Sequence, residues 1–278
     1  MSPRGRNAAE PARSVCLCSR GRVFGGIERF LTALAGWLAR RGCRVTVASA
    51  EPDLYRERWA GDLPIVAVPL PSGDDCRLSP AALWRAWRFF RRVRPDGVLF
   101  NHARNYSFAA SVLAARWAGA RRVVSFHHGT IEVAASFPRA RLFPPRALWA
   151  VRSRARFRVM ARRTDAMLCN HAANAESIVR HFGVPPGKVH VEHLGADETR
   201  FAPDPAARRR TRRQLGIAEG TLAVGTLCRL DGQKGEDILI DAVSELARGG
   251  LDVRGVLIGD GPARAELEAR AQAAGAAV

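Results

Sequence analysis

Two cations and the start of a helix lie close together in the last quarter of the chain. Arg229 follows the apolar run 221–228, and Lys234 stands five residues later, just before a segment of helical periodicity. A guanidinium can bind phosphate oxygens through two parallel hydrogen bonds, and an ammonium adds a compact positive charge. The free N–H groups at a helix start near Gly235 favour an anion at the same place. The pattern predicts a diphosphate site in which both cations stabilise developing negative charge. The alternative is two solvated surface cations.

Glycines mark two further turns. Gly25 and Gly26 separate the first apolar run from a helical stripe that begins near 27. Glycine permits positive φ and close approach of a ligand to the backbone, so we expect this turn to contact a phosphate or an acceptor. A plain tight turn is the alternative. Gly259 and Gly261 end the last apolar run. Their main expected role is to form a turn that starts a helix at Pro262, and a second expected role is to allow close approach of a nucleotide.

Two histidines close another apolar run. His127 and His128 follow 121–126, and ligands of open α/β sheets bind at the carboxyl ends of the strands. A histidine at such a place can donate a hydrogen bond to a ligand hydroxyl or to a reacting centre. The alternative for each is an ordinary polar loop residue.

Strands and helices that alternate must position these groups. Strands are expected over 14–19, 43–50, 64–70, 95–101, 121–127, 165–170, 188–194, 221–228 and 252–258. Helices are expected over 27–38, from Ser79-Pro80 onward, and over 106–117, 146–163, 172–182, 235–247 and 262–274. This alternation predicts an α/β fold with parallel sheets covered on both faces. In the helix over 235–247, the expected buried stripe is Ile238, Leu239, Ala242, Val243 and Leu246.

Composition divides the chain into parts. Residues 1–12 are polar and expected to form a disordered basic tail, and 13–200 an N-terminal Rossmann-like domain. The Pro- and Arg-rich segment 201–218 is expected to be a linker, and 219–278 a second Rossmann-like domain that is incomplete at two strands. We therefore expect that the chain is truncated within this domain.

Four segments in this order resemble the family-4 glycosyltransferases, a large group of retaining nucleotide-sugar enzymes with the GT-B fold. They are FGGIERF at 24–30, VVSFHHGT at 123–130, KVHVEHLGADETRF at 188–201, and GTLCRLDGQKGEDILIDAV at 225–243 together with VLIGDGP at 256–262. Each motif alone is weak, but the four together, in order and at suitable separations, are fairly specific.

The resemblance implies two Rossmann-like domains that face each other across a cleft, with the nucleotide sugar on the C-terminal one and most of the acceptor on the N-terminal one. It implies a transferase that needs no metal or other cofactor beyond its nucleotide diphosphate sugar. His127, or alternatively His128, would orient the donor sugar, and Gly26 with Glu28 would lie on the acceptor side. Gly225, Gly259 and Gly261 would lie on the nucleotide side.

Two departures from the family pattern concern the donor. The usual Asn-Gly-x-Asp segment reads Leu194-Gly195-Ala196-Asp197, so its Asn is missing. The pair of glutamates that holds the ribose and sugar in the family would lie beyond residue 278. The alternative to an active enzyme is therefore a catalytically inactive remnant that binds an acceptor or a membrane.

Net charge points to polyanionic partners. Lys and Arg number 44 against 26 acidic residues, which gives +18. Arg139–Arg163 is a basic segment with interleaved aromatic residues, which suits either an anionic membrane surface or a solvated face over a core stripe. Nucleic-acid binding is a further alternative, but RNP, KH and helix-turn-helix signatures are lacking, so it is not expected. The scattered cysteines favour a reducing compartment, so a cytoplasmic protein, peripheral on the inner membrane face or soluble, is expected to act in envelope polysaccharide or lipopolysaccharide synthesis.

Overall fold

The computed structural model describes residues 14–56, 58–59, 63–71, 78–102, 108–129, 144–232 and 234–275, with the backbone alone over 144–153. The chain divides into two compact units, Met1–Gly195 and Ala196–Val278. Each unit contains a parallel sheet, as the alternation of strands and helices predicted.

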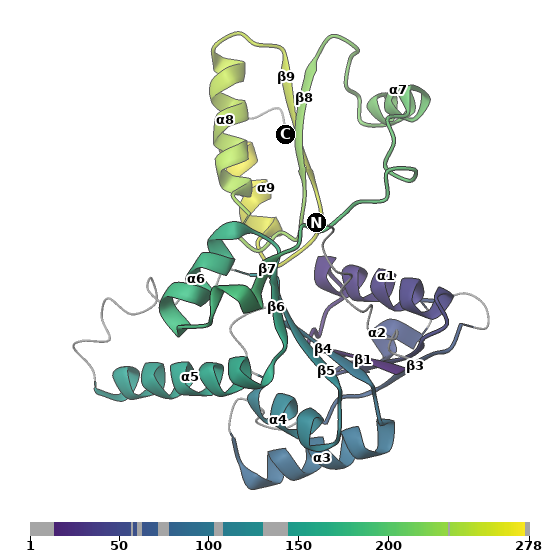
Figure 1. The fold of residues 1–278 in the computed structure, drawn as a ribbon. Helices are drawn as coiled ribbons and strands as arrows, with labels where there is room; N and C mark the ends of the chain where they lie inside the picture. The colour runs from purple at the N-terminus through teal and green to yellow at the C-terminus, as the bar shows by residue number, and fades with distance from the viewer. Residues whose placement is uncertain are drawn as a thin grey trace, which may run out of the picture. The chain divides into compact units, whose positions relative to one another are not determined.

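The first unit is built on one seven-stranded sheet in the order β3-β2-β1-β4-β5-β6-β7 (Figure 1). All six strand pairs are parallel. The strands are β1 (Ser14–Ser19), β2 (Arg44–Ser49), β3 (Ile65–Pro69), β4 (Gly97–His102), β5 (Arg122–His127), β6 (Ala166–Cys169) and β7 (Val189–Val191). The helices are α1 (Gly26–Arg40), α2 (Asp53–Arg56), α3 (Pro80–Val93), α4 (Ala109–Trp117), α5 (Pro144–Arg163), α6 (Ala172–Phe182) and the 3₁₀ turn η1 (Pro186–Lys188).

Two hydrophobic clusters cover the two faces of this sheet. Leu31 and Ala35 of α1 pack with Tyr55 of α2 on one face. On the other face, helices α3 to α6 bury side chains that include Phe90 and Phe157. Burial on both faces is what β-α-β crossovers of a parallel sheet require, and it explains the nearly continuous apolar character of β4.

Local signals place the helices where the sequence predicted them. The Ser79 hydroxyl accepts a hydrogen bond from the Ala82 N–H at 3.2 Å, and Pro80 occupies the first turn of α3. After α1, Gly42 takes φ +83°, a left-handed conformation that ends the helix and that glycine adopts without strain.

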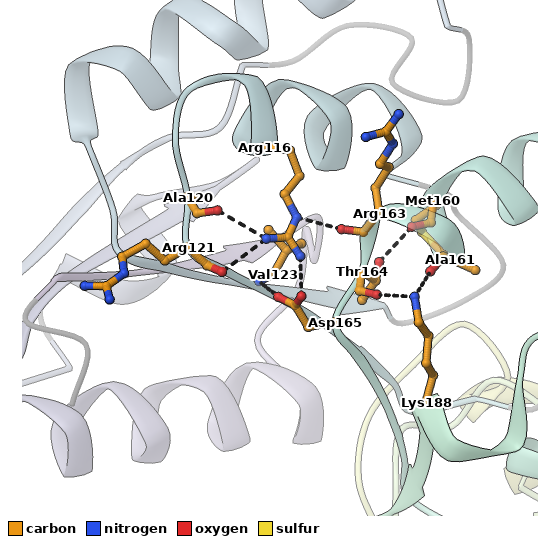
Figure 2. A network of polar contacts seen from close by, with 10 residues as sticks. All are labelled: Arg116, Ala120, Arg121, Val123, Met160, Ala161, Arg163, Thr164, Asp165 and Lys188. Carbon is orange, nitrogen blue, oxygen red and sulfur yellow. Dashed lines mark hydrogen bonds and ion pairs between the residues drawn. The ribbon is translucent and has the colours of Figure 1, made fainter. Parts of the chain in front are cut away.

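A polar network ties two helix ends to the amino ends of β5 and β6 (Figure 2). Arg116 of α4 donates to the carbonyls of Arg163 at 2.8 Å, Ala120 at 3.3 Å and Arg121 at 3.2 Å, and its Nη2 lies 2.6 Å from Asp165 Oδ1. The other carboxylate oxygen of Asp165 accepts from the Val123 N–H at 2.8 Å. Arg116 thus satisfies the last carbonyl of α5 and two carbonyls of the loop between α4 and β5. This edge is opposite to the one where ligands bind, so the network is structural.

The second unit contains α7 (Pro205–Gln214), β8 (Leu222–Leu227), α8 (Glu236–Arg248), β9 (Val253–Ile258) and α9 (Arg264–Ala273). Strands β8 and β9 form a two-stranded parallel sheet. The segment 201–218, expected to be a linker, includes helix α7. Arg212 of α7 is buried, and its guanidinium donates to the carbonyls of Ala218 and of Thr221.

The buried stripe expected for α8 is wrong at three of its five residues. Ile238 is 68 % exposed, Leu246 is 44 % exposed and Ala242 is also exposed, whereas Ile240 and Val243 are buried. The helix carries apolar residues on more than one face, and only the face that meets its neighbours, including Leu267 of α9, is covered. Apolar character alone does not decide which face finds a partner.

Candidate functional site

The strand order of the first unit fixes where a ligand would bind. Strands β2 and β3 lie on one side of β1, and β4 to β7 on the other, so the order reverses between β1 and β4. In open α/β sheets the crevice beyond the carboxyl ends at such a reversal is the usual ligand site. Here those ends carry Ser19 of β1, which is in register with Asn101 of β4, and next to it His102, in register with His127 of β5.

Four buried or half-buried polar side chains gather at these strand ends. Asn101, His102 and His127 are each at most 3 % exposed. The rings of His102 and His127 stack with centroids 4.3 Å apart, and Phe157 of α5 lies 5.7 Å from His127. His128 turns to the other face, where its ring contacts Phe126 at 4.3 Å and Phe30 of α1 at 5.3 Å. The two adjacent histidines thus serve opposite faces of the sheet.

Side-chain amides hold the backbone of both histidines. Asn174 of α6 donates to the His127 carbonyl at 3.0 Å, and Asn170 donates to the His128 carbonyl at 2.7 Å. The His128 N–H donates to the His102 carbonyl at 3.1 Å, which continues the pairing of β4 with β5 beyond the strands. The end of β5 is therefore fixed from β4, β6 and α6, as a preorganised site requires.

Several polar atoms of this cluster are buried and have no hydrogen-bond partner among the residues that the structure describes. They are Asn101 Nδ2, His127 Nε2, His128 Nδ1 and Asn170 Oδ1. A buried polar atom without a partner costs about 1–3 kcal/mol, so proteins rarely leave several together without a function for them. A ligand that carries hydroxyl groups could satisfy both the donors and the acceptors in this set.

Both histidines are neutral at physiological pH. Burial lowers the pKa of His128 to about 4. Burial also lowers the pKa of His127 well below its usual value, and the neighbouring His102 and His128 add to the effect. Neutral imidazoles can orient a hydroxyl group or accept a proton from it, but they supply no fixed positive charge.

The glycine turn before α1 has a geometry that the sequence did not predict. Neither Gly25 nor Gly26 has positive φ, and a Cβ on Gly26 would meet no atom within 4 Å. This turn therefore does not use the positive φ that glycine permits, and the fold of the described residues itself does not demand glycine at position 26. The open space beside Gly26 is compatible with a bound group.

Glu28, expected on the acceptor side, is 4 % exposed and works within the fold. Its Oε2 accepts from the Gly25 N–H at 3.0 Å, which satisfies a free donor at the start of α1. A Cβ on Gly21 would come within 1.8 Å of Glu28 Oε1, so the carboxylate also packs against the loop that follows β1. Glu28 thus stabilises the turn before α1 and the loop after β1.

In the second unit, the two predicted cations lie in the loop between β8 and α8. Arg229 Nε and Nη2 donate to Asp231 Oδ2 at 2.9 and 2.5 Å, while its side chain stays 62 % exposed. Lys234 is exposed. The ion pair orients the Arg229 guanidinium but also neutralises part of its charge.

A buried carboxylate begins α8 behind this loop. Glu236 is fully buried, accepts from the Lys234 N–H at 3.2 Å, and accepts from the Cys228 thiol at 3.6 Å. A carboxylate at a helix start is favoured by the helix dipole. No sequence pattern indicated that this acidic residue would hold the loop that bears Arg229.

Backbone packing explains the three glycines expected on the nucleotide side. A Cβ on Gly225 would lie 2.7 Å from the Val256 carbonyl oxygen. A Cβ on Gly259 would lie 1.9 Å from the Cys228 carbonyl oxygen, and a Cβ on Gly261 would lie 2.2 Å from the Leu230 carbonyl oxygen. All three let neighbouring segments of the second unit approach closely. Their first role is thus in the fold.

The basic segment Arg139–Arg163 is described from 144 for its backbone and from 154 for its side chains. Within that part, Phe157 and Met160 are buried in the core, and Arg154, Arg158, Arg162 and Arg163 are exposed. The Arg158 Nε donates to the Phe182 carbonyl at 3.2 Å. The described half of α5 is thus an arginine face over a core stripe. No helix within the described residues is long and apolar enough to cross a membrane.

Solved structures establish the class of fold. HepE of Anabaena, solved in complex with UDP-glucose, matches with a TM-score of 0.67 at 20 % identity, over 95 % of this chain and 66 % of that one. A glycosyltransferase from Rickettsia africae matches with a TM-score of 0.68 at 15 % identity, over 95 % of this chain and 65 % of that one. The fold is that of the GT-B glycosyltransferases, with a first Rossmann-like unit and a smaller second one.

Sequence comparison gives the family. The profile of Glycosyltransferase Family 4 matches residues 24–200, and the chain belongs to that family. The GDP-mannose-dependent α-(1-6)-phosphatidylinositol monomannoside mannosyltransferase of Mycolicibacterium smegmatis is 29 % identical over 261 residues, which are 91 % of this chain and 62 % of that protein. The chain thus spans less than two thirds of the length of this relative.

Proposed function

We propose that this chain transfers a sugar from a nucleotide diphosphate sugar to a glycan or lipid-linked acceptor, with retention of configuration and without a metal ion. Family membership supports the reaction class. The observation that carries the proposal for this chain is the set of buried polar atoms without partners at the ends of β4, β5 and β6, beside the reversal of strand order. Sugars carry closely spaced hydroxyl groups that both donate and accept hydrogen bonds, so a sugar could supply the partners that these buried atoms lack.

Each unit contributes different groups to the proposed reaction. In the first unit, His127 and His128 orient hydroxyl groups of the sugar, and the open turn at Gly26 receives part of a substrate. In the second unit, Arg229 and Lys234 stabilise the negative charge that forms on the leaving nucleoside diphosphate. The N–H groups at the start of α8 favour the same anion.

The class of acceptor is proposed from a relative, and the location of the protein in the cell from the positive charge of α5. The mycobacterial relative is named as a phosphatidylinositol monomannoside mannosyltransferase. A lipid-linked acceptor would bring the enzyme to an anionic inner membrane surface, and the exposed arginines of α5 are suited to bind there as a peripheral face. A role in envelope polysaccharide or lipopolysaccharide synthesis is consistent with this acceptor class.

A donor titration with matched variants tests the proposal. Purified chain is titrated calorimetrically with UDP-glucose and with GDP-mannose, and transfer of labelled hexose to a bacterial lipid extract is followed. Lys234→Ala is expected to weaken donor binding at least tenfold, whereas Arg254→Ala, an exposed cation on β9, leaves it unchanged. If a folded chain binds neither donor and transfers no hexose, the proposal that it is an enzyme is refuted. That result would favour a remnant that only binds an acceptor or a membrane.

A further inference from the structure

One hydrogen bond at the reversal of strand order connects a residue that the sequence did not single out with a candidate histidine. His128 Nε2 lies 2.5 Å from Asn101 Oδ1. Asn101 is 2 % exposed and is the second-last residue of β4, which pairs with β1 on one side and β5 on the other. The two residues lie 27 positions apart in the sequence, and only the strand order brings them together.

An amide oxygen can only accept, so the imidazole nitrogen that faces it must carry the hydrogen. A neutral imidazole has one N–H, and Nδ1 of His128 therefore presents a lone pair. That Nδ1 atom has no partner among the described residues, and neither does the amide nitrogen of Asn101. The bonded pair thus offers one unused acceptor and one unused donor.

We propose that Asn101 is a positioning residue that fixes His128 in the Nε2–H tautomer, so that Nδ1 is kept as an acceptor for a hydroxyl group of the sugar substrate. The role of Nδ1 as an acceptor for a sugar hydroxyl rests on the proposed function, whereas the assignment of the tautomer does not. A ligand hydroxyl group could donate to Nδ1, and a different oxygen atom of the same ligand could accept from the Asn101 amide N–H, because the two atoms lie on different sides of the imidazole ring.

The surroundings of the ring agree with a neutral, oriented imidazole. Phe126 and Phe30 both contact the ring, and Asn170 donates to the His128 carbonyl, so rotation of the ring is restricted by packing as well as by the hydrogen bond. The titratable side chains in this cluster are His102 and His127, and they stack on each other rather than on His128. The described cluster contains no carboxylate that could hold His128 in a charged form.

The test is an NMR measurement on the full chain labelled with ¹⁵N at its histidines, without ligand. An imidazole N–H in contact with water exchanges too fast to be seen, whereas a hydrogen-bonded one is protected. Wild type is expected to show a protected N–H on Nε2 of His128, assigned by its absence in His128→Gln. In Asn101→Ala this signal is expected to be lost, and in Asn101→Asp, which keeps an acceptor, it is expected to return.

Asn170→Ala is the matched control, because it removes the contact to the backbone of His128 without touching the ring, and the Nε2–H signal is expected to stay. Thermal melts of each variant establish that it is folded. A protected N–H on Nδ1 in wild type, or an Nε2–H signal that persists in folded Asn101→Ala, would overturn the proposal. Neither outcome depends on donor binding, so this result and that of the donor titration can fail separately.

Discussion

Replacing Gly26 by alanine should separate folding from function. The residue begins α1, its φ is not positive, and the added methyl group would meet no described atom within 4 Å. Alanine is favoured over glycine in a helix by at most about 1 kcal/mol, and less at its first turn. The free energy of unfolding should therefore be unchanged or rise by a few tenths of a kcal/mol.

The same methyl group would occupy the open space that we assign to a substrate. Forcing one extra methyl group against a well-fitted neighbour costs about 1–3 kcal/mol. On binding, this corresponds to a loss of about 5- to 150-fold in affinity or in kcat/KM. The largest effect is expected for the substrate that packs against this turn.

Urea unfolding followed by circular dichroism measures the first quantity, and hexose transfer at varied donor and acceptor concentrations measures the second. Gly216→Ala in the second unit is a contrast, because Gly216 has φ +64° and an alanine there is strained, so a loss of stability is expected. Transfer at the wild-type rate by Gly26→Ala would refute the view that this space is used. A loss of stability above about 1 kcal/mol would refute our account of the turn.

Three further outcomes follow from the described contacts. Gly261→Ala should destabilise the second unit by about 2–3 kcal/mol, measured by urea unfolding, because it pushes apart loops joined by two backbone hydrogen bonds through Leu230; an unchanged midpoint would contradict the clash. Arg116→Ala should cost about 2–3 kcal/mol, since three carbonyls and one carboxylate oxygen of Asp165 lose a partner, whereas the exposed Arg85→Ala should stay within about 0.5 kcal/mol; equal losses would show that the network contributes nothing. His128 binds its proton near pH 6.5 in the unfolded chain and near pH 4 in the folded one, so the unfolded state holds more protons between these values. The contribution of the neutral His128 side chain to the free energy of unfolding is therefore complete above about pH 6.5 and is lost as the pH falls towards 4. The stability of His128→Gln should fall less steeply than that of wild type between these pH values, and an equally steep fall would contradict the assigned pKa.

The alternation of apolar runs was sufficient to predict the sheet and most element boundaries. β1 covers the residues expected of it, and α3 begins at the predicted serine cap because that cap depends only on neighbouring residues. Helix α7 was missed since its arginine-rich sequence has no apolar stripe, and Arg212 forms its contacts through carbonyls that a sequence pattern does not reveal.

The candidate site was only partly predictable. His127 and His128 follow from the rule that ligands bind at strand ends, but Asn101 does not stand out until β4 is known to lie between β1 and β5. The role proposed for Gly26 depends only on the open space beside it, because this turn does not use the positive φ that glycine permits. The pairing of Arg229 with Asp231 was also missed, although the two residues are close in sequence, because the direction of a long side chain depends on the loop around it.

The central claim is that a nucleotide diphosphate sugar meets the ends of β4 and β5. Imidazole signals of the ¹⁵N-histidine-labelled chain, followed during titration with UDP-glucose and GDP-mannose, test this most directly. One donor should shift the His127 and His128 resonances and leave that of His181, in the last turn of α6, in place. Saturable binding of a donor that leaves both His127 and His128 unmoved would contradict the claim.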